Sequence, residues 1–558
     1  MPNRDVDISR EYEGLVVNRG IDHYALVPPE HEINWGDQPS RYKIYNDVLR
    51  LPLSLCAPDR LGSLADVLRE TAPLRHDAPL TYEELSTLLL LTNGIFERKL
   101  DVNWSQEHSS LVQYAHASYA RPTASGGGMY PFELYVVTGR GGALLPGVYH
   151  YDNAHHALER LSVGDVSSRV RAATFDSLPE GATSFILISL NFWKNYFKYH
   201  NFCYHVVTQD IGAALGSLRL ITSSLGRETS FSLWFHDEEL NRVLGLETDR
   251  ESVFGVVAFE GRASHQKSSN GNGHGLPEQS KSFGWLESRL NEKTSFQRSR
   301  YIFDLPLVQR VHQASLVTDE NRPGASDVAG AHCEQLPADG PKLPLPRPTP
   351  ELLDRHLLEV FMERSSSWGK MTSQPALEFE KLATLLRFAA ASGNYSSDVK
   401  AQSPETRFTR LMLFANHVAG VPAGIYAYDE SEDCLQTLRE VDLSIVLQRM
   451  YFLHNYNLEQ AACLLAIVGE TERMLHTFGN RGLRIRNAEA GLIAQNIYMA
   501  SAAMSLGCGA ILGFENIAIN QFLGLEGTGQ TTLLLLLVGP QRDGYGRFDY
   551  RLLPVKAG

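Results

Sequence analysis

Residues 119–133 read Tyr-Ala-Arg-Pro-Thr-Ala-Ser-Gly-Gly-Gly-Met-Tyr-Pro-Phe-Glu, and this stretch decides the interpretation of the fold. Pro122 stiffens the entry, and Ser125 precedes Gly126-Gly127-Gly128, which permit positive φ angles and a close approach to a flat ligand. Residues 134–137 are a short apolar run typical of a buried strand. The stretch predicts a glycine loop that leads into a strand. On composition alone, a plain glycine-rich turn explains the glycines equally well.

Bulk properties narrow the class of protein. The chain has 558 residues, too many for one ordinary domain. Its net charge of −13, from 51 basic and 64 acidic residues, argues against a nucleic-acid-binding surface. The N-terminus lacks the apolar region of a signal peptide, and the apolar run 533–538 is too short to span a bilayer. The six cysteines form no Cys-x-x-Cys pair. We therefore expect reduced thiols, a cytoplasmic location and no membrane partner.

An internal repeat sets the domain organisation. Pro-Gly-Val-Tyr-His-Tyr-Asp at 146–152 recurs as Ala-Gly-Ile-Tyr-Ala-Tyr-Asp at 423–429, and Leu-Gly-Leu-Glu at 244–247 recurs at 523–526. Because the order is the same in both halves, we predict two tandem copies of one α+β domain. The predicted segments are an N-terminal extension (1–44), a first domain (45–261), a flexible Gly- and Ser-rich linker (262–299) and a second domain (300–558).

Local signals place the main elements of each copy. Residues 80–94 predict a helix, with Thr81 and Glu84 as a capping box and Gly94 at the end. Residues 185–190 and 254–259 predict buried strands, and residues 210–225 predict a mostly apolar helix.

The loop at 121–133 and the following residues 146–151 resemble the flavin loop and adjoining strands of SagB-type azoline dehydrogenases. These enzymes belong to the FMN-dependent nitroreductase superfamily and oxidise thiazolines and oxazolines in peptide natural products. The resemblance implies an antiparallel-rich central sheet flanked by helices in each copy. Relatives are usually homodimers with FMN at the interface, so a fused tandem implies an intrachain pseudo-dimer. Association beyond the pseudo-dimer is left open.

The two halves carry complementary parts of the implied FMN site. Arg364, Ser365 and Ser366 match part of the family's phosphate-binding segment, whereas the first copy has Arg-Glu-Thr-Ala-Pro at 69–73. The glycine loop is intact in the first copy, and residues 403–411 of the second copy contain no glycine. Arginine and hydroxyl groups suit a phosphate, and a glycine loop suits a flat ring. We therefore expect one complete FMN site per chain, between the halves. Its loop residues are Arg121, Pro122, Ser125, Gly126 and Gly127.

Further positions of the second copy resemble family features. Gly513 and Phe514 match a Gly-Phe turn that lies beside the flavin in relatives, whereas the first copy has no glycine at 232–237. Arg481 matches a family arginine and is assigned to the cofactor. In the first copy the same position is Phe202, a departure from the pattern.

Lys198 and Tyr199 are the catalytic candidates that the resemblance implies. Azoline oxidation removes a proton from one ring carbon and a hydride from its neighbour, so a general base is needed. A nearby cation lowers the pKa of a tyrosine, which fits Tyr199 as the base and Lys198 as its partner. Without the resemblance, a basic and aromatic surface is the better interpretation of this pair. His200, Cys203 and His205 lack a fourth ligand nearby, so we expect no metal site.

These features together predict an FMN-dependent dehydrogenase that aromatises azolines, with O₂ as the electron acceptor. The expected substrate is a modified precursor peptide or a carrier-protein-bound peptide, and a cyclodehydratase is the expected partner. Two alternatives stay open. One is an NAD(P)H-dependent nitro- or quinone reductase, against which the Lys198-Tyr199 pair argues. The other is a non-catalytic scaffold subunit of a peptide-cyclising complex, which the half-degenerate copies allow.

Overall fold

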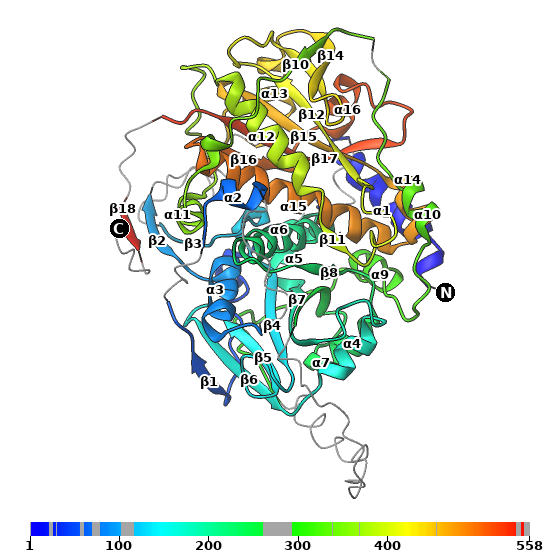
Figure 1. Ribbon diagram of the computed structural model, residues 1–558. Coiled ribbons are helices and arrows are strands. Elements are labelled where there is room, and N and C mark those ends of the chain that lie inside the picture. Colours follow the sequence, from blue (N-terminus) through cyan, green and yellow to red (C-terminus); the bar gives the residue numbers. More distant parts are fainter. Residues whose placement is uncertain are drawn as a thin grey trace, which may run out of the picture.

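The computed structural model describes residues 2–21, 26–28, 31–55, 61–69, 79–101, 116–260, 293–337, 339–367, 369–453, 455–542 and 548–551. Two β-sheets lie at opposite ends of the molecule, with the long helices α6 (Cys203–Ser224) and α15 (Arg481–Ala503) between them (Figure 1). The predicted linker 262–299 falls mostly on residues 261–292, outside the described residues.

The first sheet is built almost entirely from the first half of the chain. Its neighbouring strands pair antiparallel, except that β11 is parallel to β8. In spatial order its strands are β1 (Leu49–Pro52), β6 (Ala157–Val163), β5 (Gly147–Asp152), β4 (Phe132–Thr138), β7 (Ala182–Asn191), β9 (Glu251–Glu260), β8 (Ser230–Ser232) and β11 (Ser396–Ser397).

The second sheet repeats this order with strands of the second half. Its strands are β10 (Lys342–Pro344), β14 (Cys434–Glu440), β13 (Gly424–Asp429), β12 (Thr409–Ala415), β15 (Cys463–Glu470), β17 (Gln530–Gly539) and β16 (Gly507–Ile511). A small third sheet joins the halves through β18 (Phe548–Arg551), β2 (Glu97–Asp101) and β3 (His116–Ala120). Equal strand order in the two large sheets confirms two tandem copies of one α+β unit.

One difference between the sheets matters for function. In the first sheet β8 pairs with β11, a strand contributed by the other half. At the corresponding edge of the second sheet, β16 is the last strand among the described residues. The two halves meet at two interfaces, one beside each of these sheet edges. The interface at β8 and β11 is therefore built differently from the interface at β16.

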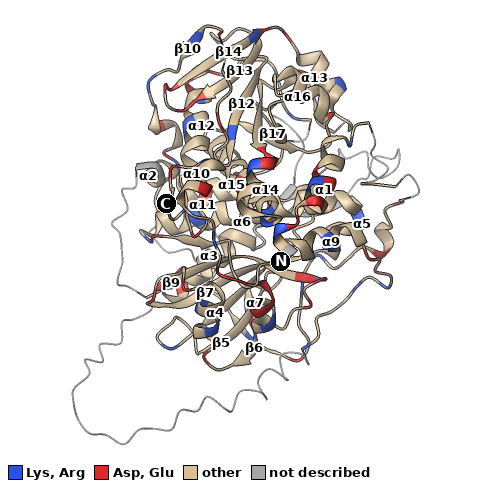
Figure 2. Cartoon of the chain, turned by 90° about the vertical axis from the view of Figure 1, so that its right-hand side faces the viewer, with Lys and Arg blue, Asp and Glu red and all other residues tan. Residues whose placement is uncertain are grey.

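Helices cover both sheets and fill the space between them. They are α1 (Asp7–Val17), α2 (Leu64–Arg69), α3 (Tyr82–Asn93), α4 (Ser167–Ala173), α5 (Trp193–Tyr199), α7 (Asp237–Leu244), α9 (Pro306–Ala314), α10 (Ala325–Gly330), α11 (Leu357–Glu363), α12 (Phe379–Ser392), α13 (Ser444–Met450), α14 (Thr471–Phe478) and α16 (Asn516–Phe522), besides α6 and α15. Helix α1 lies close to α14 and carries residues of both charges (Figure 2). There Arg10 Nε donates a hydrogen bond of 2.8 Å to Glu472 Oε1.

The predicted local elements are present. Thr81 accepts a hydrogen bond from Glu84 N at 3.1 Å, and the Glu84 carboxylate accepts one from Thr81 N at 2.9 Å, which forms the capping box. The strands expected at 185–190 and 254–259 lie within β7 and β9. The helix expected at 210–225 begins earlier, at Cys203. No helix of the described residues has both the length and the apolarity needed to cross a membrane.

Helices α6 and α15 touch backbone to backbone where two glycines meet the opposite helix. A Cβ at Gly212 would lie 1.9 Å from Ala488 O, and a Cβ at Gly491 would lie 1.9 Å from Gln209 O. The two contacts are reciprocal, because Gly212 and Gly491 hold the same position in the repeat. Every residue of α15 is buried. The crossing therefore fixes how the halves face each other.

Replacing Gly491 with alanine should destabilise the protein, because the added methyl group cannot fit against Gln209 O. Overpacking typically costs ~1–3 kcal/mol, and here backbone atoms must move, so we expect a loss at the upper end of that range or above it. Urea unfolding measures the change. Gly14→Ala, in α1, is the matched control because a Cβ at Gly14 meets nothing within 4 Å. Equal stability of the two variants would contradict this account of the crossing.

Candidate functional site

A cavity of about 970 Å³ lies between the halves and is lined by both of them. The first half contributes the N-terminal segment, the glycine loop, the end of α5 and part of α6. The second half contributes residues 364–366, residues 451–456 except 454, part of α15, and residues 510–513. Of the predicted site residues, the following line the cavity: Arg121, Ser125, Gly126, Gly127, Lys198, Tyr199, Arg364, Ser365, Ser366 and Gly513.

The glycine loop lies flat on α6. Ser125 Oγ donates a hydrogen bond to Asp210 Oδ2 at 2.7 Å, and Gly126 N donates one to Asp210 Oδ1 at 2.8 Å. Gly127 has a φ of 62°, in the left-handed region that favours glycine. A Cβ at Gly126 would lie 2.2 Å from Val206 Cγ1. The loop therefore needs its glycines to approach the helix and to expose its backbone to the cavity.

Lys198 and Tyr199 end α5 and reach the same loop. A Cβ at Gly127 would lie 2.2 Å from Tyr199 Oη and 2.9 Å from Lys198 Nζ, so both polar ends meet the loop at one point. Lys198 Nζ is 5.1 Å from the centre of the Tyr199 ring. His200 then turns the chain into α6 with a φ of 47°. The structure thus brings the two predicted catalytic residues to the cavity wall beside the glycine loop.

Arg364 connects the two halves at the cavity. Its Nη2 donates a hydrogen bond of 2.8 Å to Arg121 O, across the interface. Its Nε is buried and has no hydrogen-bond partner among the described residues. Ser366 Oγ is 3.2 Å from Tyr498 Oη. A buried guanidinium with an unused N–H at a cavity wall is suited to an anionic ligand.

Arg121 holds the start of the glycine loop rather than pointing freely into the cavity. Its Nη1 donates to Asn93 Oδ1 at 2.9 Å, and its Nη2 donates to Arg41 O at 3.0 Å. Pro122 is outside the described lining. Its carbonyl accepts a hydrogen bond of 3.3 Å from Gln495 Nε2, which ties the loop to α15 of the other half.

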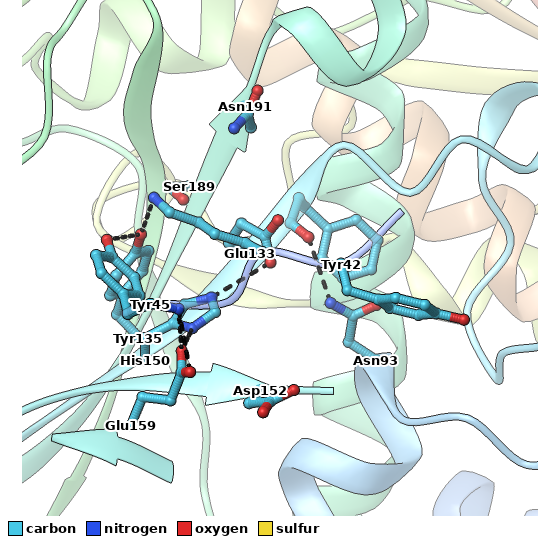
Figure 3. A network of polar contacts seen from close by, with 12 residues as sticks. Tyr42, Tyr45, Asn93, Glu133, Tyr135, His150, Asp152, Glu159, Ser189 and Asn191 are labelled. Carbon is cyan, nitrogen blue, oxygen red and sulfur yellow. Dashed lines mark hydrogen bonds and ion pairs between the residues drawn. The ribbon is translucent and has the colours of Figure 1, made fainter. Parts of the chain in front are cut away.

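Part of the cavity wall is the N-terminal segment, which contributes Trp35, Gln38, Arg41 and Tyr42. A buried polar network below it secures the segment (Figure 3). Lys43 Nζ donates to Glu251 Oε2 at 2.6 Å and to Tyr135 Oη at 2.7 Å.

The same network continues through His150. Tyr45 N donates to Glu159 Oε1 at 3.1 Å, and His150 Nδ1 lies 2.9 Å from Glu159 Oε2 (Figure 3). Burial alone would lower the pKa of His150, but its hydrogen bonds to Glu133 and Glu159 outweigh burial and raise that pKa. The network stabilises the wall of the cavity from beneath.

Besides Pro122, two further residues assigned to the cofactor lie outside the described lining of the cavity. Phe514 is buried behind Gly513, with its ring centre 4.5 Å from the Arg19 guanidinium carbon. Arg481 is not in the described lining. Its Nη1 pairs with Asp237 Oδ1 at 2.7 Å, and its Nε donates to Leu233 O at 3.0 Å, so its charge is already matched. We therefore remove Arg481 from the site. It belongs to the other interface between the halves, where β11 pairs with β8, which we call the second interface; the interface that contains the cavity is the first.

The second interface is filled by the chain itself. In the repeat, Trp234 takes the position of Gly513, and its large side chain is 2% exposed. The Asp398 carboxylate accepts hydrogen bonds from Leu233 N at 2.8 Å, Trp234 N at 3.1 Å and Ser232 Oγ at 2.7 Å. This pairing, together with β11 on β8, occupies the place where the first interface has its cavity.

The cavity is basic although the protein is acidic overall. The basic residues in its described lining are Arg19, Arg41, Arg121, Lys198, Arg364 and Lys370. Asp210 is the one acidic residue in that lining, and the glycine loop uses its carboxylate. Such a charge distribution favours an anionic ligand.

Sequence reasoning missed several lining residues. Arg19 comes from the part of the N-terminal extension before residue 33, where no local motif predicts a cavity wall. Asp210 was seen only as the start of a helix. Gln495 follows Gly491 by about one helical turn, so its side chain lies on the same face and reaches Ala124 N at 2.9 Å. Ile33-Asn-Trp-Gly-Asp-Gln-Pro-Ser-Arg-Tyr-Lys43 also resembles the N-terminal segment of the SagB-type family, and this resemblance is the available signal for Trp35, Gln38, Arg41 and Tyr42.

Burial raises the pKa of the Asp210 carboxyl to about 7, although hydrogen bonds from Ser125 and Gly126 oppose this rise. An unfolded aspartate has a pKa of about 3.9. The pKa is higher in the folded chain, so this group contributes most stability below pH ~4. That contribution is lost as the pH rises through about 7.

Asp210→Asn should therefore flatten the pH dependence of stability. We expect the free energy of unfolding of the cofactor-free variant to change less between pH 5 and pH 8 than that of the parent, by on the order of a few kcal/mol. The melting temperature of the variant should therefore depend less on pH than that of the parent. Differential scanning fluorimetry across this range measures it. Asp176→Asn, at an exposed carboxylate, is the control. A parent and a variant with parallel pH profiles would contradict the raised pKa.

Comparisons with known proteins agree with this geometry. The model of the nitroreductase family matches residues 76–262 and 363–540, together more than half of the chain. MJ1384 of Methanocaldococcus jannaschii, described as a nitroreductase, is 29% identical over 196 residues, which cover 34% of this chain and 93% of that protein. The trifolitoxin-processing protein TfxB of Rhizobium leguminosarum bv. trifolii is 26% identical over 204 residues, which cover 35% of this chain and 51% of TfxB.

A crystal structure described as a nitroreductase from Anabaena variabilis has the same overall fold. It superposes with a TM-score of 0.67 at 19% identity and covers 96% of this chain and 99% of its own. The repeated family match agrees with the duplicated strand order. The chain belongs to the nitroreductase family, as two tandem copies of the family domain joined in one polypeptide.

Proposed function

We propose that the cavity binds one FMN and that the protein is an FMN-dependent dehydrogenase. Its reaction would convert thiazoline or oxazoline rings of a peptide into thiazoles or oxazoles. The observation that carries this proposal is the position of Lys198 and Tyr199. Their polar ends meet the glycine loop inside a cavity assembled from both halves. Membership of the nitroreductase family supports the flavin.

The residues present fit FMN. Arg364, with its unused buried N–H, Ser365, Ser366 and Lys370 would hold the phosphate. The backbone of the glycine loop would face the flat ring, because a side chain at Gly127 would collide with Tyr199. The volume of about 970 Å³ is at the upper end of the range for ligand pockets, which leaves room for a substrate beside the cofactor.

The protein's own residues account for the proton transfer. Bound FMN would supply the hydride acceptor, and O₂ would be the final electron acceptor. Tyr199, as a phenolate, would take the proton from the azoline ring carbon. Lys198 is 5.1 Å from the ring centre of Tyr199, and its positive charge favours the phenolate. The pair lies partly buried at the cavity wall, where water is restricted and the charge interaction is stronger than in bulk solvent.

The cavity entrance suits a peptide substrate. Phe452, Leu453 and Tyr119 line the cavity and are 44%, 37% and 36% exposed, so they offer apolar contacts to residues flanking the ring. The trifolitoxin-processing relative supports a peptide as the substrate class. We propose a modified precursor peptide or a carrier-protein-bound peptide, delivered by a cyclodehydratase partner.

Tyr199→Phe should keep FMN but lose the reaction. Removal of a general base typically lowers the rate by ~10²–10⁴-fold, and we expect a loss of kcat in that range. Mass spectrometry of an azoline-containing peptide measures its dehydrogenation, and released flavin is quantified for each variant. Tyr301→Phe, at a tyrosine that is 72% exposed, is the control.

Three outcomes would overturn parts of the proposal. Full turnover by the Tyr199→Phe variant would remove Tyr199 as the base. Steady NAD(P)H consumption with nitroaromatics, without peptide oxidation, would favour a nitro- or quinone reductase. A protein that takes up no FMN would favour a scaffold subunit.

A further inference from the structure

Arg19 is a buried arginine from outside the repeat that reaches the cavity. It follows α1 and is 5% exposed. Its guanidinium carbon is 4.5 Å from the ring centre of Phe514 and 5.4 Å from that of Phe202. It lies in the described cavity lining. Two aromatic rings therefore hold the guanidinium, with Phe514 from the second half and Phe202 from the first.

The hydrogen bonds of Arg19 hold one wall of the cavity. Its Nε and Nη2 both donate to Leu512 O, at 3.1 and 3.0 Å, and its Nη1 donates to Val16 O at 2.6 Å. Leu512 and Gly513 line the cavity. Gly513 O accepts a hydrogen bond from Phe452 N at 2.8 Å. The turn at 512–513 is thus held through its two carbonyls, one of them by Arg19.

Helix α1 is docked firmly enough to place Arg19. Tyr12 Oη donates to Asn201 O at 2.9 Å and accepts from His205 N at 3.0 Å. Arg486 Nη2 donates to Glu13 Oε1 at 2.8 Å in a buried ion pair. Burial lowers the pKa of Arg19 to about 10, with Glu13 and Glu515 opposing, so Arg19 is a cation at neutral pH.

The second interface contains the same arrangement with a different arginine. Arg481 Nε donates to Leu233 O at 3.0 Å, and its guanidinium carbon is 4.4 Å from the ring centre of Phe235. In the repeat, Leu233 and Phe235 correspond to Leu512 and Phe514. Arg481 is the first residue of α15, and its counterpart immediately before α6 is Phe202.

The first interface therefore lacks an arginine at position 202. The guanidinium of Arg19 nevertheless lies where the guanidinium of Arg481 lies at the second interface, beside the turn and the following phenylalanine. Arg19 makes two of the contacts that Arg481 makes at the other interface, a hydrogen bond to the carbonyl of the turn and a contact with the ring of the following phenylalanine. Arg481 also pairs with Asp237. Phe202 provides a second ring against the incoming guanidinium.

We propose that Arg19 is a positioning residue of the cavity, supplied by the N-terminal extension in place of an arginine at position 202. It holds the Leu512–Gly513 turn in the orientation that the bound ligand requires. The effect of Arg19 on ligand binding rests on the proposed FMN site. The effect of Arg19 on the conformation of the turn is independent of that site. The N-terminal extension is accordingly a component of the cavity and not an accessory to it.

A rescue experiment tests this inference. The variants are Arg19→Leu, Phe202→Arg and the double variant R19L/F202R, and Arg10→Leu on the surface of α1 is the matched control. Hydrogen–deuterium exchange of residues 510–515 is measured on cofactor-free protein. We expect exchange to be at least about tenfold faster in Arg19→Leu, and to return to within about threefold of the parent in the double variant.

The second readout is the Kd for FMN, from quenching of flavin fluorescence. We expect Arg19→Leu to weaken FMN binding about tenfold or more and the double variant to recover it, with Arg10→Leu unchanged. If Arg19→Leu is too unstable to purify, Arg19→Lys replaces it. That variant keeps the charge but loses the paired hydrogen bonds, so we expect faster exchange at 510–515.

The outcomes separate the two proposals. Unchanged exchange at 510–515 in the Arg19 variants, or a double variant as impaired as the single one, would overturn the role of Arg19. A parent that binds no FMN would overturn the proposed cofactor but would leave the exchange result as the test of Arg19. A parent that binds FMN with the same Kd as Arg19→Leu would overturn the ligand-positioning part.

Discussion

The crossing of α6 and α15 is the constraint on which the rest of the structure depends. Because Gly212 and Gly491 have no side chains, the two helices approach until backbone meets backbone. The contact is reciprocal, so it relates the halves by an approximate two-fold axis and creates two interfaces. Each helix then presents an acidic residue to a loop of its own half. Asp210 binds the glycine loop, and Glu489 Oε1 accepts hydrogen bonds from Phe408 N and Thr409 N.

The two interfaces have diverged in opposite directions from this common frame. Gly513 leaves space at the first, and Trp234 fills that space at the second. At the first interface the Asp210 carboxylate accepts hydrogen bonds from Ser125 Oγ and Gly126 N, whereas at the second Lys400 Nζ lies 2.6 Å from Glu489 Oε2 in a buried ion pair. The second interface holds the halves together through contacts such as the Arg481–Asp237 ion pair, whereas the first keeps a large cavity whose described lining has six basic residues and one acidic residue.

Much of this architecture follows from the sequence. The motifs repeated in the same order in both halves predict two tandem copies of one α+β domain, and the glycine loop and the Lys198-Tyr199 pair are both assigned to the first copy. Local patterns could not show which interface a residue serves. Arg481 matches its family position, but the duplication places it at the filled interface, against Asp237. Arg19 reaches the cavity through contacts with residues distant in sequence, which periodicity and spacing cannot predict. The raised pKa of Asp210 depends on tertiary burial.

The central claim is that one interface is a ligand site and the other is closed by the chain. Flavin content of the purified, FMN-reconstituted protein tests it most directly, with FMN released by heat, separated from FAD and counted against protein concentration. The account predicts about one FMN per chain. About two FMN per chain would show that the interface closed by Trp234 and Asp398 also binds cofactor, and would contradict the account.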